Sequence, residues 1–186
     1  MSYGYHFPQK LIHWLMAVLI TLDLVVARKF GGDMALWDRL ESRIDHASLN
    51  LVVMGLFLLR VYLRQKHGAP AALVSMPNWQ VNLSKLTHLA IYFLMASLFV
   101  TGLITAMHAT DPLLAFGVYD LTLGKTDEVL FQFVRQFHEL STQVMIALIA
   151  LHVAAALFHQ VFLRDQVMSR MWKSQQQKDT QSKLQP

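Results

Sequence analysis

Four long apolar stretches, separated by polar segments, dominate the pattern of hydrophobic and polar positions along the chain. None of the four shows the alternation of a half-buried strand, and each is much longer than an ordinary strand. An α-helix rises about 1.5 Å per residue, so about 20 residues cross the roughly 30 Å hydrocarbon core of a bilayer. The pattern therefore predicts an all-α fold, a transmembrane four-helix bundle. The apolar stretches run from about Leu11 to Val26, His46 to Tyr62, Leu86 to Met107 and Phe137 to Leu163, and predict helices over about 10–28, 45–65, 84–108 and 136–164.

The segments between these stretches carry residues that interrupt helices. A mixed-charge run with two glycines covers 30–45, two prolines fall within 65–85, and a proline and two glycines fall within 109–136. Because proline and glycine end or weaken helices, we expect linkers at these three places. Residues 173–186 are rich in Gln and Lys, which predicts a disordered polar tail after a membrane domain over 1–172.

Composition narrows the class of protein. Hydrophobic residues make up 54% of the 186 positions and charged residues 15%, with a mean hydropathy of +0.36. Soluble domains average about 25% charged residues, so this composition argues against a soluble enzyme and against disorder. The chain has no cysteine, which excludes disulfides, thiolate metal sites, iron–sulfur clusters and covalently attached c-type haem. The net charge of +4 comes from basic residues at the edges of the apolar stretches. That placement fits a lipid bilayer as partner better than nucleic acid.

The distribution of basic residues predicts how the helices are oriented. If the N-terminus is cytoplasmic, ten lysines and arginines fall on the cytoplasmic side and six on the outer side. Cytoplasmic segments of membrane proteins carry an excess of Lys and Arg, so the count predicts that both termini are cytoplasmic. The ten are Lys10, Arg60, Arg64, Lys66, Lys85, Arg164, Arg170, Lys173, Lys178 and Lys183, and the six are Arg28, Lys29, Arg39, Arg43, Lys125 and Arg135.

Four histidines fall at two matched depths of the predicted bundle. His138 and His152 are 14 residues apart on the fourth stretch, so they face within about 40° of the same direction and lie about 21 Å apart along the axis. His13 on the first stretch is level with His152, and His46 on the second is level with His138. Ionisable residues inside a membrane are functional candidates, and imidazole is a good ligand for haem iron. Depth alone thus predicts an axial pair for each of two haems b. The alternative is that these histidines mark helix ends and interfaces.

The placement of these residues resembles a known family. His13-Trp14 in the first stretch, His46 opening the second, and His138 with His152 on the fourth look like the prokaryotic cytochrome b561 family. The resemblance covers about Phe7 to Trp172 and implies a multi-pass cytochrome of the bacterial inner membrane with two bis-histidine haems b. It also implies electron transfer across the membrane and exchange with quinone. The best-characterised type in this family oxidises superoxide and reduces ubiquinone.

Further residues extend this pattern. Arg60 follows His46 by 14 residues, so it faces the bundle at the depth of the inner haem. There it binds haem propionates or serves as a positive-inside anchor. His88 lies close in depth to His13 and is the rival inner ligand. Since the family has its inner ligands on the first and fourth helices, the resemblance assigns His88 to a hydrogen bond with a propionate or a quinone. Gly102, at the depth of the outer haem, makes room for a porphyrin or for close helix packing.

Two residues near the cytoplasmic end of the fourth stretch are candidates for a quinone site. His159 follows His152 by seven residues and offers a hydrogen bond to a quinone head group or a propionate; alternatively, it faces lipid head groups. Arg164 adds fixed positive charge, which suits a quinone that gains electrons and negative charge. Asp23, an acid in the outer half of the first stretch, relays protons or marks the end of that helix.

Three functions remain open at this point. The first is a superoxide:quinone oxidoreductase, the second a quinone-linked cytochrome subunit serving a dehydrogenase or hydrogenase-like partner, and the third a non-redox transporter whose histidines bind metal or protons. The outer segments hold six basic and nine acidic residues, which opposes the steering of superoxide unless basic residues cluster locally. We expect an outer donor, superoxide or a redox protein, to reduce the outer haem, and quinone to be reduced at the inner leaflet. Candidates for a local basic cluster are Arg28, Lys29, Arg39, Arg43 and Arg135.

Overall fold

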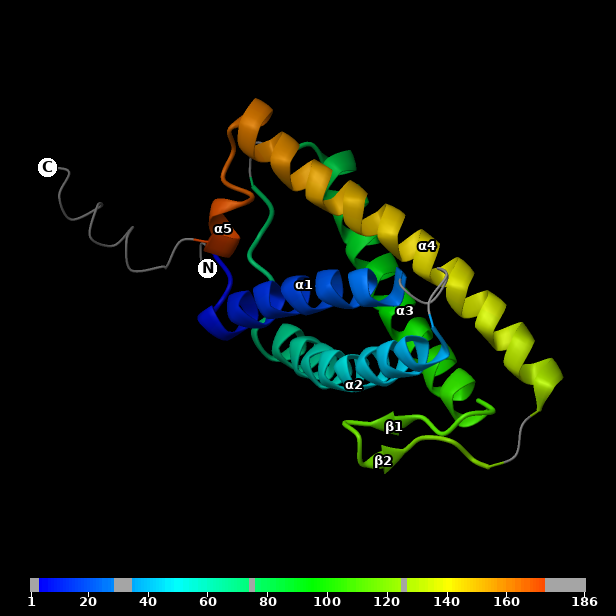
Figure 1. Cartoon of the computed structure of the whole chain (residues 1–186). Helices are drawn as coiled ribbons and strands as arrows, with labels where there is room; N and C mark the ends of the chain where they lie inside the picture. The colour runs from blue at the N-terminus through cyan, green and yellow to red at the C-terminus, as the bar shows by residue number, and fades with distance from the viewer. Residues whose placement is uncertain (1–3, 29–34, 74–75, 125–126, 173–186) are drawn as a thin grey trace, which may run out of the picture.

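Helices make up most of the structure, a computed structural model that describes residues 4–28, 35–73, 76–124 and 127–172. Four of the helices are long and apolar enough to cross a bilayer, so the predicted all-α transmembrane fold is confirmed. The tail predicted at 173–186 lies outside the described residues. The helices are α1 (Phe7–Arg28), α2 (Leu36–His67), α3 (Asn78–Met107), α4 (Glu128–Phe158), the π-helical segment η2 (His159–Leu163) and the short α5 (Ser169–Trp172) (Figure 1).

The second and fourth spanning helices are longer than the hydropathy pattern predicted. α2 begins at Leu36 rather than at 45, so much of the linker expected at 30–45 is helical. α4 begins at Glu128 rather than at 136, and Asp127 caps it by accepting a hydrogen bond from the Leu130 backbone N–H at 3.0 Å. Hydropathy locates the part of a helix that lies in lipid, and it misses the polar turns that extend the same helix beyond the membrane.

The other helix ends also differ from the prediction. α3 starts at Asn78, directly after Pro77, although the sequence predicted a linker as far as 85. α1 starts at Phe7 rather than at 10, with a proline in its first turn, where a missing N–H costs no hydrogen bond. Regular α-helix ends at Phe158 rather than at 164, because the chain changes to π-helical hydrogen bonding and then turns at Arg164, which has a φ of 49°.

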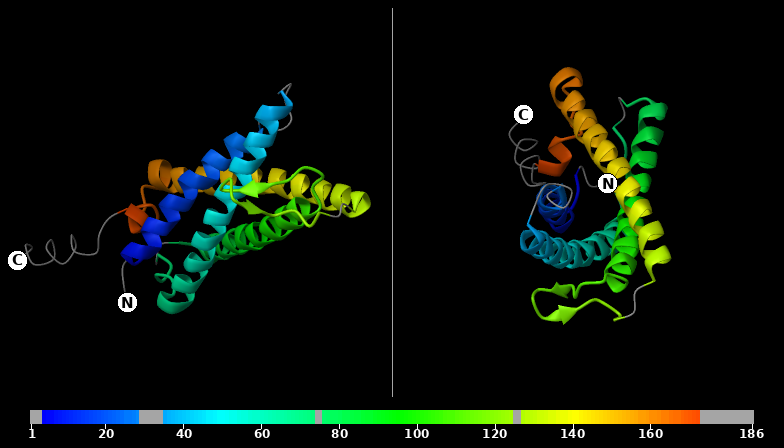
Figure 2. Two further views of the ribbon diagram at one scale, coloured as in Figure 1. Left: turned by 60° about the horizontal axis from the view of Figure 1, so that its bottom comes forward. Right: turned by 45° about the vertical axis from the view of Figure 1, so that its right-hand side comes forward.

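The four spanning helices form two antiparallel pairs. α1 packs along α2, and α3 packs along α4, whereas contact between the two pairs is much less extensive. Figure 2 shows the two pairs from two further directions. Most apolar side chains face outward: Leu22, Phe93 and Leu151 are each more than half exposed. Apolar surface of this extent requires lipid around the bundle.

We call one end of the bundle the terminal end, because the start of α1 and the helix α5 meet there (Figure 1). The Tyr5 backbone N–H donates a hydrogen bond to the Arg170 carbonyl oxygen at 3.4 Å. The Trp14 indole N–H donates to the Met171 carbonyl oxygen at 3.3 Å, and its ring packs edge-on against Trp172. The first and last described segments are therefore held together on one side of the bundle.

The opposite end is the hairpin end. Two short strands, β1 (Leu114–Ala115) and β2 (Tyr119–Asp120), pair antiparallel within the connection between α3 and α4. The hairpin is tied to α2, because the Phe116 backbone N–H donates to the Ser48 hydroxyl oxygen at 2.7 Å. This connection, predicted only as a linker, therefore covers α2 close to His46.

Candidate functional site

The hairpin-end pair consists of His46 on α2 and His138 on α4. Their ring centroids lie 6.4 Å apart, and the ring planes are nearly perpendicular, at 89°. His46 Nδ1 lies 2.8 Å from a carboxylate oxygen of Asp23, and His138 Nδ1 lies 2.9 Å from the Thr101 hydroxyl oxygen. With Nδ1 engaged on both rings, Nε2 is the candidate metal ligand of each ring, and the Asn50 amide nitrogen lies 3.4 Å from Nε2 of His46.

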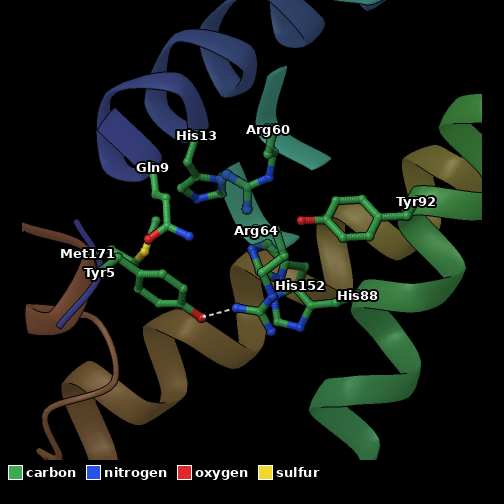
Figure 3. A pocket seen from close by; sticks show the side chains of 9 residues that line it. All are labelled: Tyr5, Gln9, His13, Arg60, Arg64, His88, Tyr92, His152 and Met171. Carbon is green, nitrogen blue, oxygen red and sulfur yellow. Dashed lines mark hydrogen bonds between the residues drawn. The ribbon is translucent and has the colours of Figure 1, made fainter. Parts of the chain in front are cut away.

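The terminal cluster consists of His13, His88 and His152, from three different helices. The centroids of His13 and His152 lie 6.2 Å apart with ring planes at 85°, and those of His88 and His152 lie 5.3 Å apart. Figure 3 shows the three imidazoles converging with two arginines on a pocket. The pocket is lined by Tyr5, Gln9, His13, Arg60, Arg64, His88, Tyr92, His152 and Met171.

Hydrogen bonding separates His88 from the other two members of the terminal cluster. The His88 Nδ1–H donates to the Ser84 carbonyl oxygen, one turn earlier on α3, at 2.6 Å. Within the described residues, no side chain hydrogen-bonds to the ring of His13 or His152. His88 is therefore oriented by its own helix, whereas His13 and His152 are oriented by packing.

The separations of two histidine pairs fit imidazoles bound to opposite sides of one iron. A metal–imidazole bond is about 2.0 Å long and the bonded nitrogen lies about 1.2 Å from the ring centre, so opposed ligands place their centroids about 6.4 Å apart. His46 with His138, at 6.4 Å, and His13 with His152, at 6.2 Å, match this span. His88 with His152, at 5.3 Å, is too close. Each matching pair joins α4 to the opposite helix pair, which fits a planar group lying between the two pairs.

Two arginines on α2 bring positive charge to the terminal pocket. The Arg60 guanidinium lies 6.0 Å from the Tyr92 ring centre, and that of Arg64 lies 5.9 Å from the Tyr5 ring centre. No carboxylate of the described residues lies within 4.0 Å of either guanidinium. Because an unpaired cation in a membrane span is costly, the pocket is suited to an anionic group. Arg60 was predicted as a site residue and Arg64 was not, although the spacing of one helical turn puts both on one face of α2.

Gly102 makes room for a histidine ring. A Cβ atom at this position would lie 3.2 Å from Cε1 and 3.6 Å from Nδ1 of His138. The preceding residue, Thr101, is the one that hydrogen-bonds to the same ring. The sequence predicted either porphyrin approach or helix packing here, and the contact observed is with the side chain of His138.

The two candidate quinone residues lie beyond the terminal pocket. His159 begins η2, and its Nδ1 forms a close hydrogen bond with a carboxylate oxygen of Asp165. The other Asp165 oxygen accepts a hydrogen bond from the Val167 backbone N–H at 3.0 Å. Neither His159 nor Arg164 lines the pocket, and Arg164 is exposed. Asp165, which the sequence analysis did not single out, is thus the direct partner of His159.

A basic cluster lies at the hairpin end. The charges of Arg39 and Arg135 are close enough to Arg43 to act on its guanidinium, which also lies 3.6 Å from a carboxylate oxygen of Asp111. The Arg39 Nε is buried and has no hydrogen-bond partner in the described part of the chain. Three of the five residues proposed for a local basic cluster therefore do gather. Lys29 and the side chain of Arg28 lie outside the described residues.

A binding site for a single bare metal ion is not evident in the structure. Among residues 4–28, 35–73, 76–124 and 127–172, no group of three or more His, Asp or Glu side chains is arranged to hold such an ion. The histidines instead lie in two cross-helix pairs whose ring centroids are 6.2 and 6.4 Å apart.

Comparison with known proteins identifies the family. The sequence model of the prokaryotic cytochrome b561 family matches residues 4–174. Cytochrome b561 homolog 1 of Escherichia coli (strain K12) is 22% identical over 171 residues, covering 88% of this chain and 93% of the relative. The probable superoxide oxidase CybB of Yersinia pestis is 23% identical over 163 residues, covering 86% and 90%. With its four apolar helices and a family match over most of its length, this chain belongs to the prokaryotic cytochrome b561 family of haem b electron-transfer proteins and is a multi-pass protein of the bacterial inner membrane.

Proposed function

We propose that this protein binds two haems b and carries electrons from a donor at the hairpin end to membrane quinone at the terminal end. The observation that carries the proposal is the pair of matched histidine separations, 6.4 Å for His46 with His138 and 6.2 Å for His13 with His152. When bound, each haem supplies one-electron exchange at its iron. One histidine pair would hold each haem at its iron, and Arg60 with Arg64 would neutralise propionates at the terminal end.

His88 has a different role in this proposal. Its ring is too close to His152 to be the opposed ligand, and its Nδ1–H is already donated to Ser84. His88 lines the same pocket as Arg60 (Figure 3). This arrangement favours a hydrogen bond from His88 to a propionate or to a quinone, as the family resemblance implied.

We infer that the terminal end faces the cytoplasm. Of the basic residues in the described part of the chain, seven belong to the segments of that end and four to those of the hairpin end. The hairpin end, with β1, β2 and the basic cluster of Arg39, Arg43 and Arg135, then faces the periplasm. A donor arriving from outside meets the hairpin-end pair first.

Superoxide is the donor that the observations favour. The Yersinia pestis relative is named a probable superoxide oxidase, and the basic cluster supplies the local positive potential that steers an anion despite an acidic outer surface. Two superoxide ions each give up one electron and leave as O₂. One quinone takes up the two electrons with two protons to become quinol. The His159–Asp165 pair, near the terminal side of the bilayer, is suited to deliver protons to it.

Haem content tests the proposal most directly. Protein purified in detergent should hold two acid-extractable, low-spin haems per chain by a pyridine haemochrome assay, and a stoichiometry near one would contradict it. Rapid mixing with superoxide should then reduce these haems at a rate that falls as ionic strength rises, because steering is screened by salt. An absence of reduction by superoxide, with both haems present, would favour the quinone-linked subunit of a dehydrogenase.

A further inference from the structure

One carboxylate lies deep in a spanning helix at the hairpin end. Asp23 on α1 is only 8% exposed. One of its oxygens lies 2.8 Å from His46 Nδ1, and the other accepts a hydrogen bond from the Asn50 amide at 3.0 Å. A buried acid inside a membrane requires such partners, but it has paired with the histidine proposed as an axial ligand.

The surrounding hydrogen bonds fix the direction of this contact. The Asn50 amide nitrogen has two hydrogens, which Asp23 Oδ2 and the His46 carbonyl oxygen accept at 3.0 Å and 2.8 Å. The remaining oxygen of Asp23 is then the acceptor for the His46 Nδ1–H. The ring is then held in the form that carries its hydrogen on Nδ1, as in carboxylate–histidine–metal arrangements, and the Asn50 amide nitrogen lies 3.4 Å from Nε2.

The other three proposed ligands have no comparable partner. The Thr101 hydroxyl donates to the Ser97 carbonyl oxygen at 2.8 Å, so it meets the Nδ1–H of His138 as a neutral acceptor. His13 and His152 have no hydrogen-bonding side chain within the described residues. Among the described residues, a direct hydrogen bond to a carboxylate is therefore specific to His46 among the four proposed ligands.

We propose that Asp23 is a positioning residue that makes His46 a more electron-rich ligand and gives the hairpin-end haem the lower reduction potential of the two. This inference rests on the proposed function. A carboxylate acceptor raises the basicity of a ligating imidazole, and both this effect and the negative charge favour the ferric state. Such a difference in potential would favour electron transfer from the hairpin end to the terminal end, where Arg60 and Arg64 would favour the reduced, less positive state of the bound group.

Spectroelectrochemical titration of Asp23→Asn tests this inference, because Asn keeps the size and an acceptor oxygen but removes the charge. The wild-type protein should give two one-electron components, and His46→Ala should remove the component with the lower midpoint potential. In Asp23→Asn the midpoint potential of the lower-potential component should rise by about 59 mV. For a one-electron couple, this shift is about a tenfold increase in the ferrous-to-ferric ratio at a given applied potential. The upper component should stay unchanged, and Asp23→Glu should restore the wild-type curve.

Two controls separate the inference from general charge effects. Asp38→Asn removes an exposed carboxylate from the first turn of α2 at the same end, and Thr101→Val removes the neutral partner of His138. Each should shift the lower component less than Asp23→Asn does. Equal shifts in Asp38→Asn and Asp23→Asn, or a shift of both components together, would overturn the inference.

Haem loss is also informative. If Asp23→Asn fails to bind the hairpin-end haem, Asp23→Glu decides: recovery of that haem with its wild-type potential supports the inference, and absence of the haem overturns it. A wild-type protein that titrates as one haem contradicts the proposed function instead, so the two failures are distinguishable.

Discussion

The hairpin-end pair and the terminal cluster are built differently although their histidine separations are nearly the same. At the hairpin end each ring is held by a side chain, His46 by Asp23 and His138 by Thr101. At the terminal end the rings of His13 and His152 have no such partner among the described residues. What the terminal end has instead is a pocket with two arginines.

This difference teaches how one bundle can host two similar cofactors with separate roles. A side chain that hydrogen-bonds to a ligating imidazole orients the ring and changes the reduction potential of the bound iron. Cationic side chains instead bind anionic groups and stabilise the reduced state. The hairpin end is accordingly organised to control its ligands, and the terminal end to bind charge and exchange electrons with a second substrate.

The largest expected effect is the loss of one haem at a time. His46→Ala and His138→Ala should each abolish the hairpin-end haem and spare the other, and His13→Ala and His152→Ala should do the reverse. Each variant should retain about half of the haem absorbance of the wild type in purified protein. His67→Ala is the matched control, because this histidine lies at the end of α2 and should leave both haems bound.

The same series of variants, with His88→Ala added, tests whether His13 or His88 is the ligand that pairs with His152 at the terminal haem. Loss of the terminal haem in His88→Ala, together with its retention in His13→Ala, would contradict the ligand assignment made from ring separations.

The next largest effect concerns quinone reduction at the terminal end alone. His159→Ala should slow quinone reduction by one or two orders of magnitude in membranes, consistent with loss of a positioned proton donor. Asp165→Asn should slow it in the same direction, because Asp165 is the hydrogen-bond partner of His159. Reduction of the haems by the donor should remain at the wild-type rate in both variants. An unchanged quinone rate would exclude His159 and point to a quinone site nearer the hairpin end.

A smaller effect should follow from removing one arginine of the terminal pocket. Arg60→Gln should weaken retention of the terminal haem about tenfold on dilution, because an ionic hydrogen bond contributes about 1.5 kcal/mol. The hairpin-end haem should be unaffected. Lys66→Gln removes an exposed positive charge from the same end of α2 and should change neither haem. Equal losses in the two variants would mean that net charge, and not the pocket, determines retention.

The smallest effect should come from a single methyl group. Gly102→Ala places a Cβ 3.2 Å from the His138 ring, so we expect a displaced ring, a changed low-spin EPR signal of the hairpin-end haem and a loss of stability of about 1 kcal/mol. The terminal haem should keep its signal.

Gly55→Ala provides the opposite comparison within α2. A Cβ at Gly55 meets nothing within 4 Å, so this variant should be neutral or more stable by up to about 1 kcal/mol, since alanine favours helix over glycine. Thermal unfolding of both variants checks the pair of expectations. A Gly102→Ala protein that matches Gly55→Ala would show that the His138 ring is not confined.

The sequence by itself determined the class of the fold. Four apolar stretches long enough to span a bilayer, with few charges and no cysteine, left an all-α membrane bundle as the outcome. Helical periodicity was also sufficient to put His138 and His152 on one side of α4 and to name His13 and His46 as residues at the same depths. These features depend only on residues close together along the chain, so the pattern of side chains carries them.

Only the tertiary structure decided which groups meet across helices. The packing of α1 against α2 brings Asp23 to His46. The packing of α3 against α4 brings Thr101 and Gly102 to the ring of His138. The polar starts of α2 and α4 were likewise missed, because hydropathy reports immersion in lipid and not helix length. The depth of a residue in the membrane follows from its position along its own helix, which the sequence determines. The rotation of one helix relative to another is determined by packing between residues far apart in the chain.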